Sequence, residues 1–423
     1  MAREIILQKL PVGWSYNLLD NIAERCSGHT PSKSFPEYWN GGIKWISLAD
    51  SCRLDKGYVY ETDKEISLEG IKNSSAEVHP AETVVLSRDA GVGKSGVMAT
   101  PMAVSQHFIA WKCDNKEKLH SWYLYNWLQL NKDEFERQAV GSTIKTIGLP
   151  YFKKLRIAVP PFDEQKKIAQ ILSAWDKAIS VTENLLANSQ QQKKALMQQL
   201  LTGKKRLLDE NGVRFSGEWR SGPLGSLVGR IYGGGTPSRA NSELWGGDIP
   251  WVTVKDLISP RINGAQEYIN EIGLAESASN LVLAGTVIIA TRMAVGKTVM
   301  ASCDVAINQD LKAICASEYV CSEYIFNWFL LHSEQIAKMG TGSTVKGVQV
   351  EAIKALNMTI PKAVEEQQKI ATVLFAADAE ISTLEKKLAC LKDEKKALMQ
   401  QLLTGKRRVS VPVKVDEKEA VRA

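Results

Sequence analysis

A 44-residue segment of this chain occurs twice, and this repeat limits the possible folds more than any other feature. The first copy begins at Glu164 and the second at Glu366, with a constant offset of 202 residues and 26 identical positions. The run KKALMQQLLTGK is unchanged between the copies. Identity of this extent at a fixed period indicates a duplicated structural unit, so the 423-residue chain is expected to fold as two related halves.

The regions that precede the two copies match more weakly but in the same order. GHTPSK, a tryptophan and GGIKWISLAD start at Gly28, and GGTPSR, a tryptophan and GDIPWVTVKD start at Gly234. Further on, Arg88 with its Gly-Lys pair matches Arg292 with a second Gly-Lys pair. A glutamine and a Gly-Ser-Thr-Ile/Val-Lys segment follow in each region, and the offset drifts between 201 and 206. The chain therefore has the order A–B–A′–B′, in which the B segments have stayed alike while the A segments have diverged.

This order divides the chain into five predicted segments. Two are globular, two are helical, and the last is expected to be a flexible tail. In order along the chain they are 1–161, 162–207, 208–362, 363–409 and 410–423.

The B segments have the heptad pattern of long helices that pair. Each helix is expected to run about 38 residues, or roughly 57 Å at 1.5 Å per residue. Gly203 and Gly405 stand where a helix-terminating glycine is expected. The residues predicted to pair are Ile168, Leu172, Trp175, Ile179, Leu186, Leu196 and Leu200 in the first helix, and Ile370, Leu374, Ile381, Leu384, Leu388, Leu391, Leu398 and Leu402 in the second.

The two helices are predicted to pair with each other and not with copies of themselves. Thr182 and Ser189 weaken the first seam at positions where the second has leucine, and a homodimer of the first helix would stack these polar positions. An antiparallel pair would relate the two globular regions by a pseudo-two-fold axis. A general dimerisation coiled coil is the alternative.

The globular regions are predicted to contain a small irregular sheet and one aromatic helix each, beginning at Ser121 and Ser322. The predicted strands are 43–48, 83–87, 108–112 and 155–159 in the first region, and 249–254, 286–291, 311–315 and 356–360 in the second. The predicted fold class is α+β, with two pseudo-symmetric globular domains joined by two long helices that form an antiparallel coiled coil.

Composition argues against several classes of protein. No apolar run reaches the roughly 18 residues of a membrane span, and the start of the sequence lacks the features of a secretory signal, so we expect a cytoplasmic protein without membrane contact. The seven cysteines include no C-x-x-C pair and the five histidines no H-E-x-x-H, which argues against a disulfide framework and a metal site. The net charge of +6 is compatible with nucleic-acid binding but does not establish it.

Two loops imitate a phosphate-binding loop, GVGKS ending at Ser95 and AVGKT ending at Thr298. A P-loop needs a glycine five positions before the glycine of its Gly-Lys pair, and those positions hold Arg88 and Thr291. We interpret both as basic loops that offer cations to DNA. No catalytic motif repeats in both copies, so the chain is predicted not to be an enzyme.

Polar and basic side chains in the globular regions are the candidates for DNA contact, because such groups hydrogen-bond phosphates and base edges. For the Gly-Ser-Thr-Ile/Val-Lys segments, a capped turn is an equally consistent interpretation. The candidates are Thr30, Ser32, Lys33, Arg88, Lys94, Ser95, Gln106, Ser142, Thr143 and Lys145 in the first half, and Thr236, Ser238, Arg239, Arg292, Lys297, Thr298, Gln309, Ser343, Thr344 and Lys346 in the second.

The order of these parts is similar to one family, the specificity subunits of type I restriction-modification enzymes. The resemblance rests on the Pro-x-Gly-Trp start at Pro11, the G-x-T-P-S and G-S-T-x-K segments and, above all, the E-Q-x-K-I-A helix that ends in L-L-T-G-K. It covers nearly the whole chain. The second region departs from the pattern at its start, where Ser216-Gly217-Glu218-Trp219 replaces Pro-x-Gly-Trp, and this affects only its boundary.

The resemblance implies a function and a set of partners. It implies that 1–161 and 208–362 are target recognition domains, each reading one half of a split double-stranded DNA sequence. It also implies two modification subunits that carry an adenine methyltransferase, and restriction subunits that carry a nuclease and a motor. S-adenosylmethionine, ATP and Mg²⁺ are then expected on those subunits, and no cofactor on this chain. The alternatives are a non-catalytic coiled-coil adaptor with two heads that bind ligands other than DNA and, less favoured, an enzyme.

If Arg88 and Lys94 contact DNA, replacing either residue by alanine should weaken binding to the first half of the target. The measurement is affinity for a DNA duplex at moderate salt, where phosphate contacts contribute strongly. Unchanged affinity would remove the residue from the interface.

Overall fold

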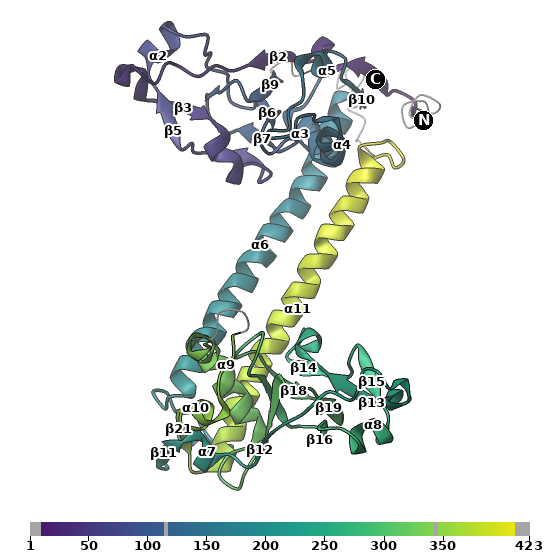
Figure 1. Cartoon of the computed structure of the whole chain (residues 1–423). Helices are drawn as coiled ribbons and strands as arrows, with labels where there is room; N and C mark the ends of the chain where they lie inside the picture. Colours follow the sequence, from purple (N-terminus) through teal and green to yellow (C-terminus); the bar gives the residue numbers. More distant parts are fainter. Residues whose placement is uncertain (1–9, 114–116, 342–345, 411–423) are drawn as a thin grey trace, which may run out of the picture. The chain divides into compact units, whose positions relative to one another are not determined.

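The computed structural model describes residues 10–113, 117–341 and 346–410, so all of the predicted tail after residue 410 lies outside the described residues. The chain forms two compact units (Figure 1). The first unit contains Met1–Glu183 and Lys387–Ala423, and the second contains Asn184–Lys386. Each unit consists of one globular region and part of each of two long helices.

The long helices are α6 (Phe162–Leu200) and α11 (Val364–Leu402), with 39 residues each. Acidic side chains in the first turn of each helix interact favourably with the positive end of the helix dipole. Each helix is followed by a glycine in the left-handed region, Gly203 with φ +71° and Gly405 with φ +74°. A residue with a Cβ atom is strained there, so these glycines end the helices. The prediction of two helices of about 38 residues is confirmed.

Ion pairs show that α6 and α11 run antiparallel within each unit. The pairs in the first unit are Glu164–Arg408, Asp176–Lys395 and Glu183–Lys392. The pairs in the second unit are Lys193–Asp378 and Arg206–Glu366. In both units, residue numbers rise along one partner as they fall along the other, which is possible only in an antiparallel arrangement.

The predicted pairing residues are all buried or half-buried, but they divide by location. Those nearest the helix ends belong to the cores of the globular regions. They are Ile168, Leu172 and Leu402 in the first unit, and Leu200, Ile370 and Leu374 in the second. Between these ends, the polar seam position Thr182 is 3% exposed and donates its hydroxyl hydrogen to the carbonyl oxygen of Ala178 at 2.8 Å.

The globular region of the first unit contains three small sheets. The strand orders are β1-β10, β2-β9-β6-β7-β4 and β5-β3-β8. The strands are β1 (Ser15–Leu18), β2 (Glu24–Ser27), β3 (Trp39–Ile46), β4 (Tyr58–Val59), β5 (Lys64–Ile66), β6 (Val84–Ser87), β7 (Ser95–Met98), β8 (Ala103–Val104), β9 (Phe108–Lys112) and β10 (Arg156–Val159). The helices are α2 (Leu68–Lys72), α3 (Ser121–Leu130), α4 (Lys132–Gln138) and α5 (Leu149–Lys153).

The second unit repeats this plan with one added strand. The strand orders are β11-β21, β12-β20-β17-β18-β14 and β15-β13-β19-β16. The strands are β11 (Trp219–Pro223), β12 (Ile231–Gly233), β13 (Trp245–Val252), β14 (Arg261–Ile262), β15 (Glu267–Ile269), β16 (Asn280–Val282), β17 (Val287–Ala290), β18 (Thr298–Ala301), β19 (Val305–Ile307), β20 (Leu311–Ile314) and β21 (Asn357–Pro361). The helices are α7 (Leu224–Leu227), α8 (Glu271–Ala275), α9 (Ser322–Met339) and α10 (Val350–Lys354).

The eight predicted strands and both aromatic helices are present, but the first strand predicted in each unit begins four residues earlier and ends two residues earlier than expected. The predicted strand 43–48 ends at Ile46, because Ser47 and Asp50 form a capping box that begins a short 3₁₀ helix, Leu48–Cys52. Thr253 and Asp256 form the equivalent capping box in the second unit. The predicted fold class is confirmed.

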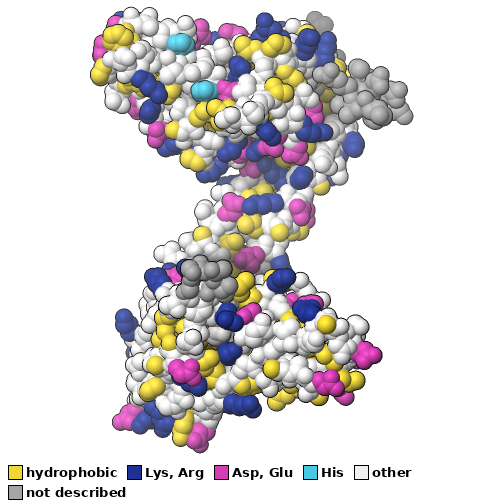
Figure 2. Space-filling model, viewed as in Figure 1, with side chains coloured by type: hydrophobic (Ala, Val, Ile, Leu, Met, Phe, Trp, Pro, Cys, Tyr) yellow, Lys and Arg dark blue, Asp and Glu magenta, His cyan; other side chains and the backbone are white. Residues whose placement is uncertain are grey.

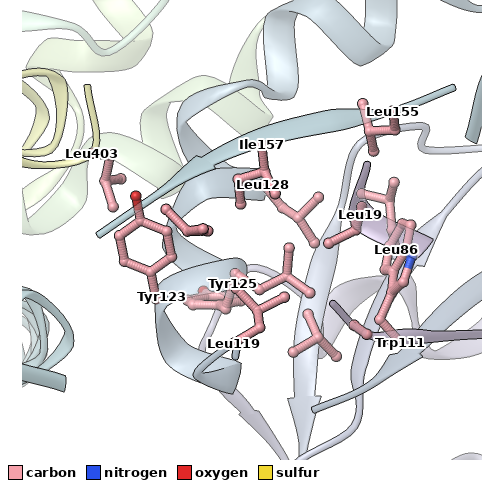
Figure 3. Close-up of a cluster of buried hydrophobic side chains, with 14 of the residues drawn as sticks. Leu19, Leu86, Trp111, Leu119, Tyr123, Tyr125, Leu128, Leu155, Ile157 and Leu403 are labelled. Carbon is pink, nitrogen blue, oxygen red and sulfur yellow. The ribbon is translucent and has the colours of Figure 1, made fainter. Parts of the chain in front are cut away.

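The core of each globular region continues into the ends of both long helices. In the first unit, Leu403, just after α11, belongs to the same buried cluster as Tyr123 and Ile157 (Figure 3). The cluster also contains Leu172 of α6. The compact units therefore differ from the predicted sequence segments, because each globular region shares its core with helical residues from two distant parts of the chain.

Candidate nucleic-acid interface

A tight hairpin loop in each unit carries the Gly-Lys pair that resembles a phosphate-binding loop. It joins β6 to β7 in the first unit and β17 to β18 in the second. Gly93 and Gly296 have φ values of +85° and +86°. A Cβ atom on Gly296 would lie 2.6 Å from the carbonyl oxygen of Ser333 in α9. The hairpin and its packing on the neighbouring helix therefore require glycine, which accounts for the motif without a bound phosphate.

Backbone hydrogen bonds align the two loops one residue away from the alignment that the sequence suggested. The bond from Arg88 N to His107 O in the first unit corresponds to the bond from Thr291 N to Asp310 O in the second. Likewise, the bond from Ile147 N to Arg88 O corresponds to the bond from Val348 N to Thr291 O. Arg88 is thus equivalent to Thr291, and Asp89 is equivalent to Arg292. The sequence-based match of Arg88 with Arg292 is wrong, because it followed the identical letter and not the backbone register.

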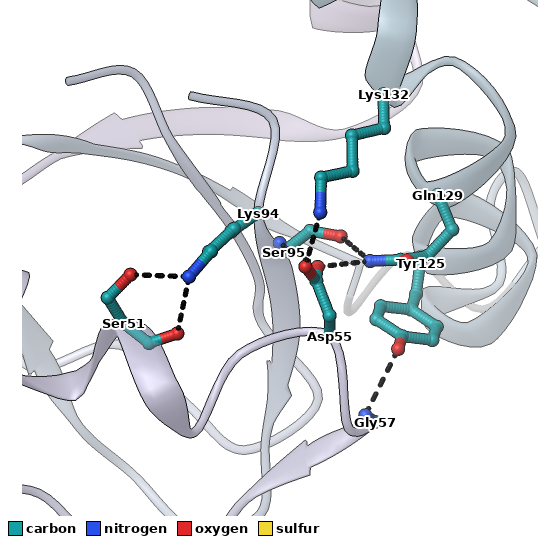
Figure 4. A network of polar contacts seen from close by, with 8 residues as sticks. All are labelled: Ser51, Asp55, Gly57, Lys94, Ser95, Tyr125, Gln129 and Lys132. Carbon is teal, nitrogen blue, oxygen red and sulfur yellow. Dashed lines mark hydrogen bonds and ion pairs between the residues drawn. The ribbon is translucent and has the colours of Figure 1, made fainter. Parts of the chain in front are cut away.

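Two of the candidates, Ser95 and Thr298, are buried at the starts of strands β7 and β18. The hydroxyl oxygen of Ser95 accepts a hydrogen bond of 2.8 Å from the Gln129 amide, within a network that includes Asp55 (Figure 4). The hydroxyl of Thr298 donates to the carbonyl oxygen of Gly296 at 3.1 Å. The structure corrects the prediction for these two residues, since neither side chain is available to DNA.

The cations of the two loops differ in how far they are free to meet a ligand. The Lys94 ammonium donates to the hydroxyl and carbonyl oxygens of Ser51, at 2.9 and 3.3 Å (Figure 4). The Arg88 side chain is 18% exposed and that of Arg292 is 56% exposed. Lys297 is exposed and has no ion pair within the described part of the chain. The second unit therefore presents the more accessible cations.

Two features fix the position of the G-x-T-P-S segment: its glycine packs closely against a neighbouring strand, and the tryptophan that follows it donates a hydrogen bond to the segment's backbone. A Cβ atom on Gly28 would lie 1.8 Å from the Val104 carbonyl oxygen, and one on Gly234 would lie 1.8 Å from that of Ile307. The indole of the following tryptophan donates to the backbone of the segment in both units, at 3.2 and 3.1 Å. This arrangement leaves five candidate side chains exposed: Ser32, Lys33, Thr236, Ser238 and Arg239.

The structure brings three separate candidate segments together in each unit. The Thr236 hydroxyl donates to the Gln309 side-chain carbonyl at 2.6 Å, and Thr30 makes the same bond to Gln106. The loop before β20 is in turn bonded to the β17–β18 loop, through the Thr291 and Asp310 backbones described above.

The third segment is the Gly-Ser-Thr-Ile/Val-Lys region, which is followed by a residue that pairs with the loop carrying the Gly-Lys motif. Asp89 and Arg292 each form an isolated β-bridge just after this region, to Thr146 and Gly347. The candidates of this region that the structure describes, Ser142, Thr143, Lys145 and Lys346, are exposed. Ser343 and Thr344 lie outside the described residues.

In the second unit a hollow of about 350 Å³ is lined by residues of the β17–β18 loop, of the loop before β20, and of the chain just before and after the Gly-Ser-Thr-Val-Lys region. Its lining includes Arg292 and Gln309, which the sequence singled out, and Lys312 and Gln349, which it did not. Lys312 lies in β20, whose other three residues are buried, and burial lowers the pKa of its ammonium group. A lysine within a buried strand was the signal that could have identified this position.

Charge is not gathered into one basic patch on the face drawn in Figure 2. Lys and Arg side chains are interspersed with Asp and Glu on both units. The net charge of +6 is therefore not concentrated in one basic surface on this face. No helix in the part of the chain that the structure describes is long and apolar enough to cross a membrane.

The chain is thus a duplicated α+β domain on paired helices, and each copy has a polar cluster, formed by the three candidate segments described above, at the same place in its fold. Residues 11–188 and 217–392 both match the family described as type I restriction modification DNA specificity domain. The chain belongs to this family, and it contains the domain twice.

Curated relatives agree with this assignment. The chain is 29% identical over 280 residues to the specificity subunit of the type I restriction enzyme EcoR124I/EcoR124II from Escherichia coli, which covers 63% of this chain and 65% of that protein. It is 25% identical over 392 residues to the type I restriction enzyme MjaVIII specificity subunit of Methanocaldococcus jannaschii, covering 84% and 87%. The chain thus spans just under two thirds of the first of these relatives.

Solved structures have the same fold. The type I restriction-modification S subunit from M. genitalium superposes with a TM-score of 0.58 at 13% identity, over 94% of this chain and 97% of that one. A chain from a type I R-M system, solved in work on its complex assembly and conformational transition, gives 0.59 at 17% identity, over 94% and 100%. At these identities the similarity establishes the fold alone.

Proposed function

We propose that this chain is the DNA specificity subunit of a type I restriction-modification complex, and that each globular region reads one half of a bipartite double-stranded target. The observation that carries the proposal is the contrast between the two polar clusters. Their backbones have the same hydrogen-bond register, while some side chains at equivalent positions differ, such as Asp89 and Arg292. Two domains that read different half-sites need the same backbone fold but different side-chain contacts to DNA.

The proposal assigns the chemistry to other subunits. The chain recognises DNA and is not itself catalytic, while two modification subunits supply adenine methylation and restriction subunits supply cleavage. S-adenosylmethionine, ATP and Mg²⁺ belong to those subunits in this scheme, and the complex acts in the cytoplasm. The repeated helical surfaces offer the same patch twice, which suits two copies of one modification subunit.

The proposal is tested by reconstituting the chain with its modification subunits and mapping the methylated adenines on genomic DNA. The expected result is one split sequence, with two specified parts separated by an unspecified gap. Methylation without sequence preference, or no association with a methyltransferase, would favour the alternative of a coiled-coil adaptor that does not read DNA.

We further propose that the lengths of α6 and α11 set the unspecified gap. Inserting seven residues between Asp176 and Lys193, and seven between Asp378 and Lys395, adds two helical turns to each helix and preserves the heptad register. Each helix gains about 10.5 Å, close to three base pairs at 3.4 Å each. The mapped gap should therefore widen by about three base pairs, with both half-sites unchanged.

A matched control separates helix length from a general disturbance of the helices. Inserting four residues at the same two places breaks the seven-residue period, so this variant is expected to lose methylation or stability instead of shifting the gap. If the heptad variant methylates the original sequence, the helices do not set the spacing.

A further inference from the structure

The polar clusters of the two units differ by an exchange of charge at equivalent backbone positions. Asp89 of the first unit is equivalent to Arg292 of the second, and His107 is equivalent to Asp310. The first unit thus has an acid facing a histidine where the second has an arginine facing an acid. Phosphates are the same along any DNA, so a phosphate contact has no reason to change sign between two copies of one domain, whereas a base contact does.

In the first unit the carboxylate of this pair is occupied by its neighbours. Asp89 Oδ1 accepts a 2.5 Å hydrogen bond from the Thr146 hydroxyl, and Oδ2 lies 2.7 Å from His107 Nδ1. The Arg88 guanidinium adds an ion pair at 3.7 Å. The Asp89 side chain is 15% exposed, so this cluster is closed.

In the second unit the equivalent cluster is open and rich in hydrogen-bond donors. The Arg292 side chain is 56% exposed and lines the hollow together with Lys312 and the amides of Gln309 and Gln349. Lys312 replaces the buried Ile109 of the first unit, and Gln349 replaces Gly148. Both of these replacements add a donor, while Asp310, which replaces His107, adds an acid.

Asp310 lies beside the guanidinium of Arg292 without a hydrogen bond to it. One oxygen of Asp310 accepts a hydrogen bond of 3.1 Å from the Asn308 amide, and the other lies 3.9 Å from Arg292 Nη1. An acid at this distance attracts the guanidinium, and it also disfavours an approaching phosphate, because the two negative charges repel. A neutral base edge carries no such penalty.

We propose that Arg292, which lies beside Asp310, reads the O6 and N7 acceptors of a guanine in the half-site of the second domain. An arginine makes two parallel hydrogen bonds to this edge, and no other base presents two acceptors there. Lys312 and the two glutamines supply further donors around the base. The inference rests on the proposed function, and it adds one specificity-determining residue and the base that this residue selects.

The test compares Arg292→Ala and Arg292→Lys in the reconstituted complex by mapping methylated sequences and measuring affinity. Arg292→Ala should lose preference for one guanine in the second half-site by about 5- to 150-fold, and Arg292→Lys should lose less of it, because a lysine ammonium also reaches O6 and N7 but lacks the fixed fork of the guanidinium. The first half-site should be unchanged. Lys362→Ala, which removes an exposed cation elsewhere in the same unit, should leave both half-sites intact.

Other outcomes overturn the inference. If Arg292→Lys keeps the sequence and Arg292→Ala weakens all sequences equally, with a salt dependence reduced by about one, Arg292 contacts a phosphate. If neither variant changes the motif or the affinity, the hollow is not part of the interface. A wild-type complex that methylates no bipartite sequence would show that the proposed function itself fails, which is distinct from a failure of Arg292 alone.

Discussion

Arg206→Ala is expected to lower the free energy of unfolding by about 3 kcal/mol, because it leaves a buried carboxylate without its partner. The Glu366 side chain is 2% exposed, and the Arg206 guanidinium binds it through two parallel hydrogen bonds of 2.5 and 2.7 Å. Arg206 also donates to the carbonyl oxygen of Gly217 at 2.9 Å and lies over the Trp219 ring. One side chain thus ties the end of α6 to the start of α11 and to the start of the second globular region.

Chemical denaturation of the purified chain, followed by tryptophan fluorescence, measures this effect. Arg206→Ala combined with Glu366→Gln removes the unpaired charge and should recover part of the loss. The matched control is Lys392→Ala, which breaks the pair with Glu183, where both side chains are about half exposed. This control should cost less than about 1 kcal/mol. If Arg206→Ala and Lys392→Ala lower the free energy of unfolding equally, the buried pair contributes no more stability than the exposed pair.

Leu172→Ala is expected to lower the free energy of unfolding by about 2–5 kcal/mol, because it opens a cavity in the core of the first unit. Leu172 lies in α6, but it is fully buried in the same cluster as Trp111 and Leu402. The helix and the globular region should therefore lose structure together. Helical circular dichroism and tryptophan fluorescence should shift to the same lower denaturant concentration.

The control for this prediction is Leu185→Ala in the same helix, where the side chain is 48% exposed. It should change stability by less than about 0.5 kcal/mol. If Leu172→Ala shifts the dichroism but leaves the fluorescence transition in place, the helix end and the domain core are not one cooperative unit.

The long helices and the duplication could be predicted because their signals extend over many residues. A heptad pattern sustained over 39 residues is typical of a long helix that pairs with another helix, and a glycine marks where each helix ends. The strands that were missed are short and carry polar or glycine residues, such as the four residues of β7 and the three of β12. Such strands exist because their neighbours pair with them, and a local pattern does not show that pairing.

The candidate site was predicted less well, for a physical reason at each residue. Ser95 and Thr298 follow a lysine in a loop-like motif, but each begins a strand whose side chains are buried. The equivalence of Arg88 with Arg292 rested on one letter, while the true register depends on hydrogen bonds to segments far along the chain. Asp89 and Lys312 were missed because their roles depend on those same long-range contacts.

The ion pairs between the helices have a consequence for how such chains can diversify. Lys193 of the first copy binds Asp378 of the second, and Lys395 of the second binds Asp176 of the first. Each copy thus carries both a lysine and an aspartate of these pairs. A half of the chain can therefore form both ion pairs with any other half that keeps the same lysine and aspartate. Recombination could therefore exchange a complete recognition half between related genes, with no compensating change at the junction.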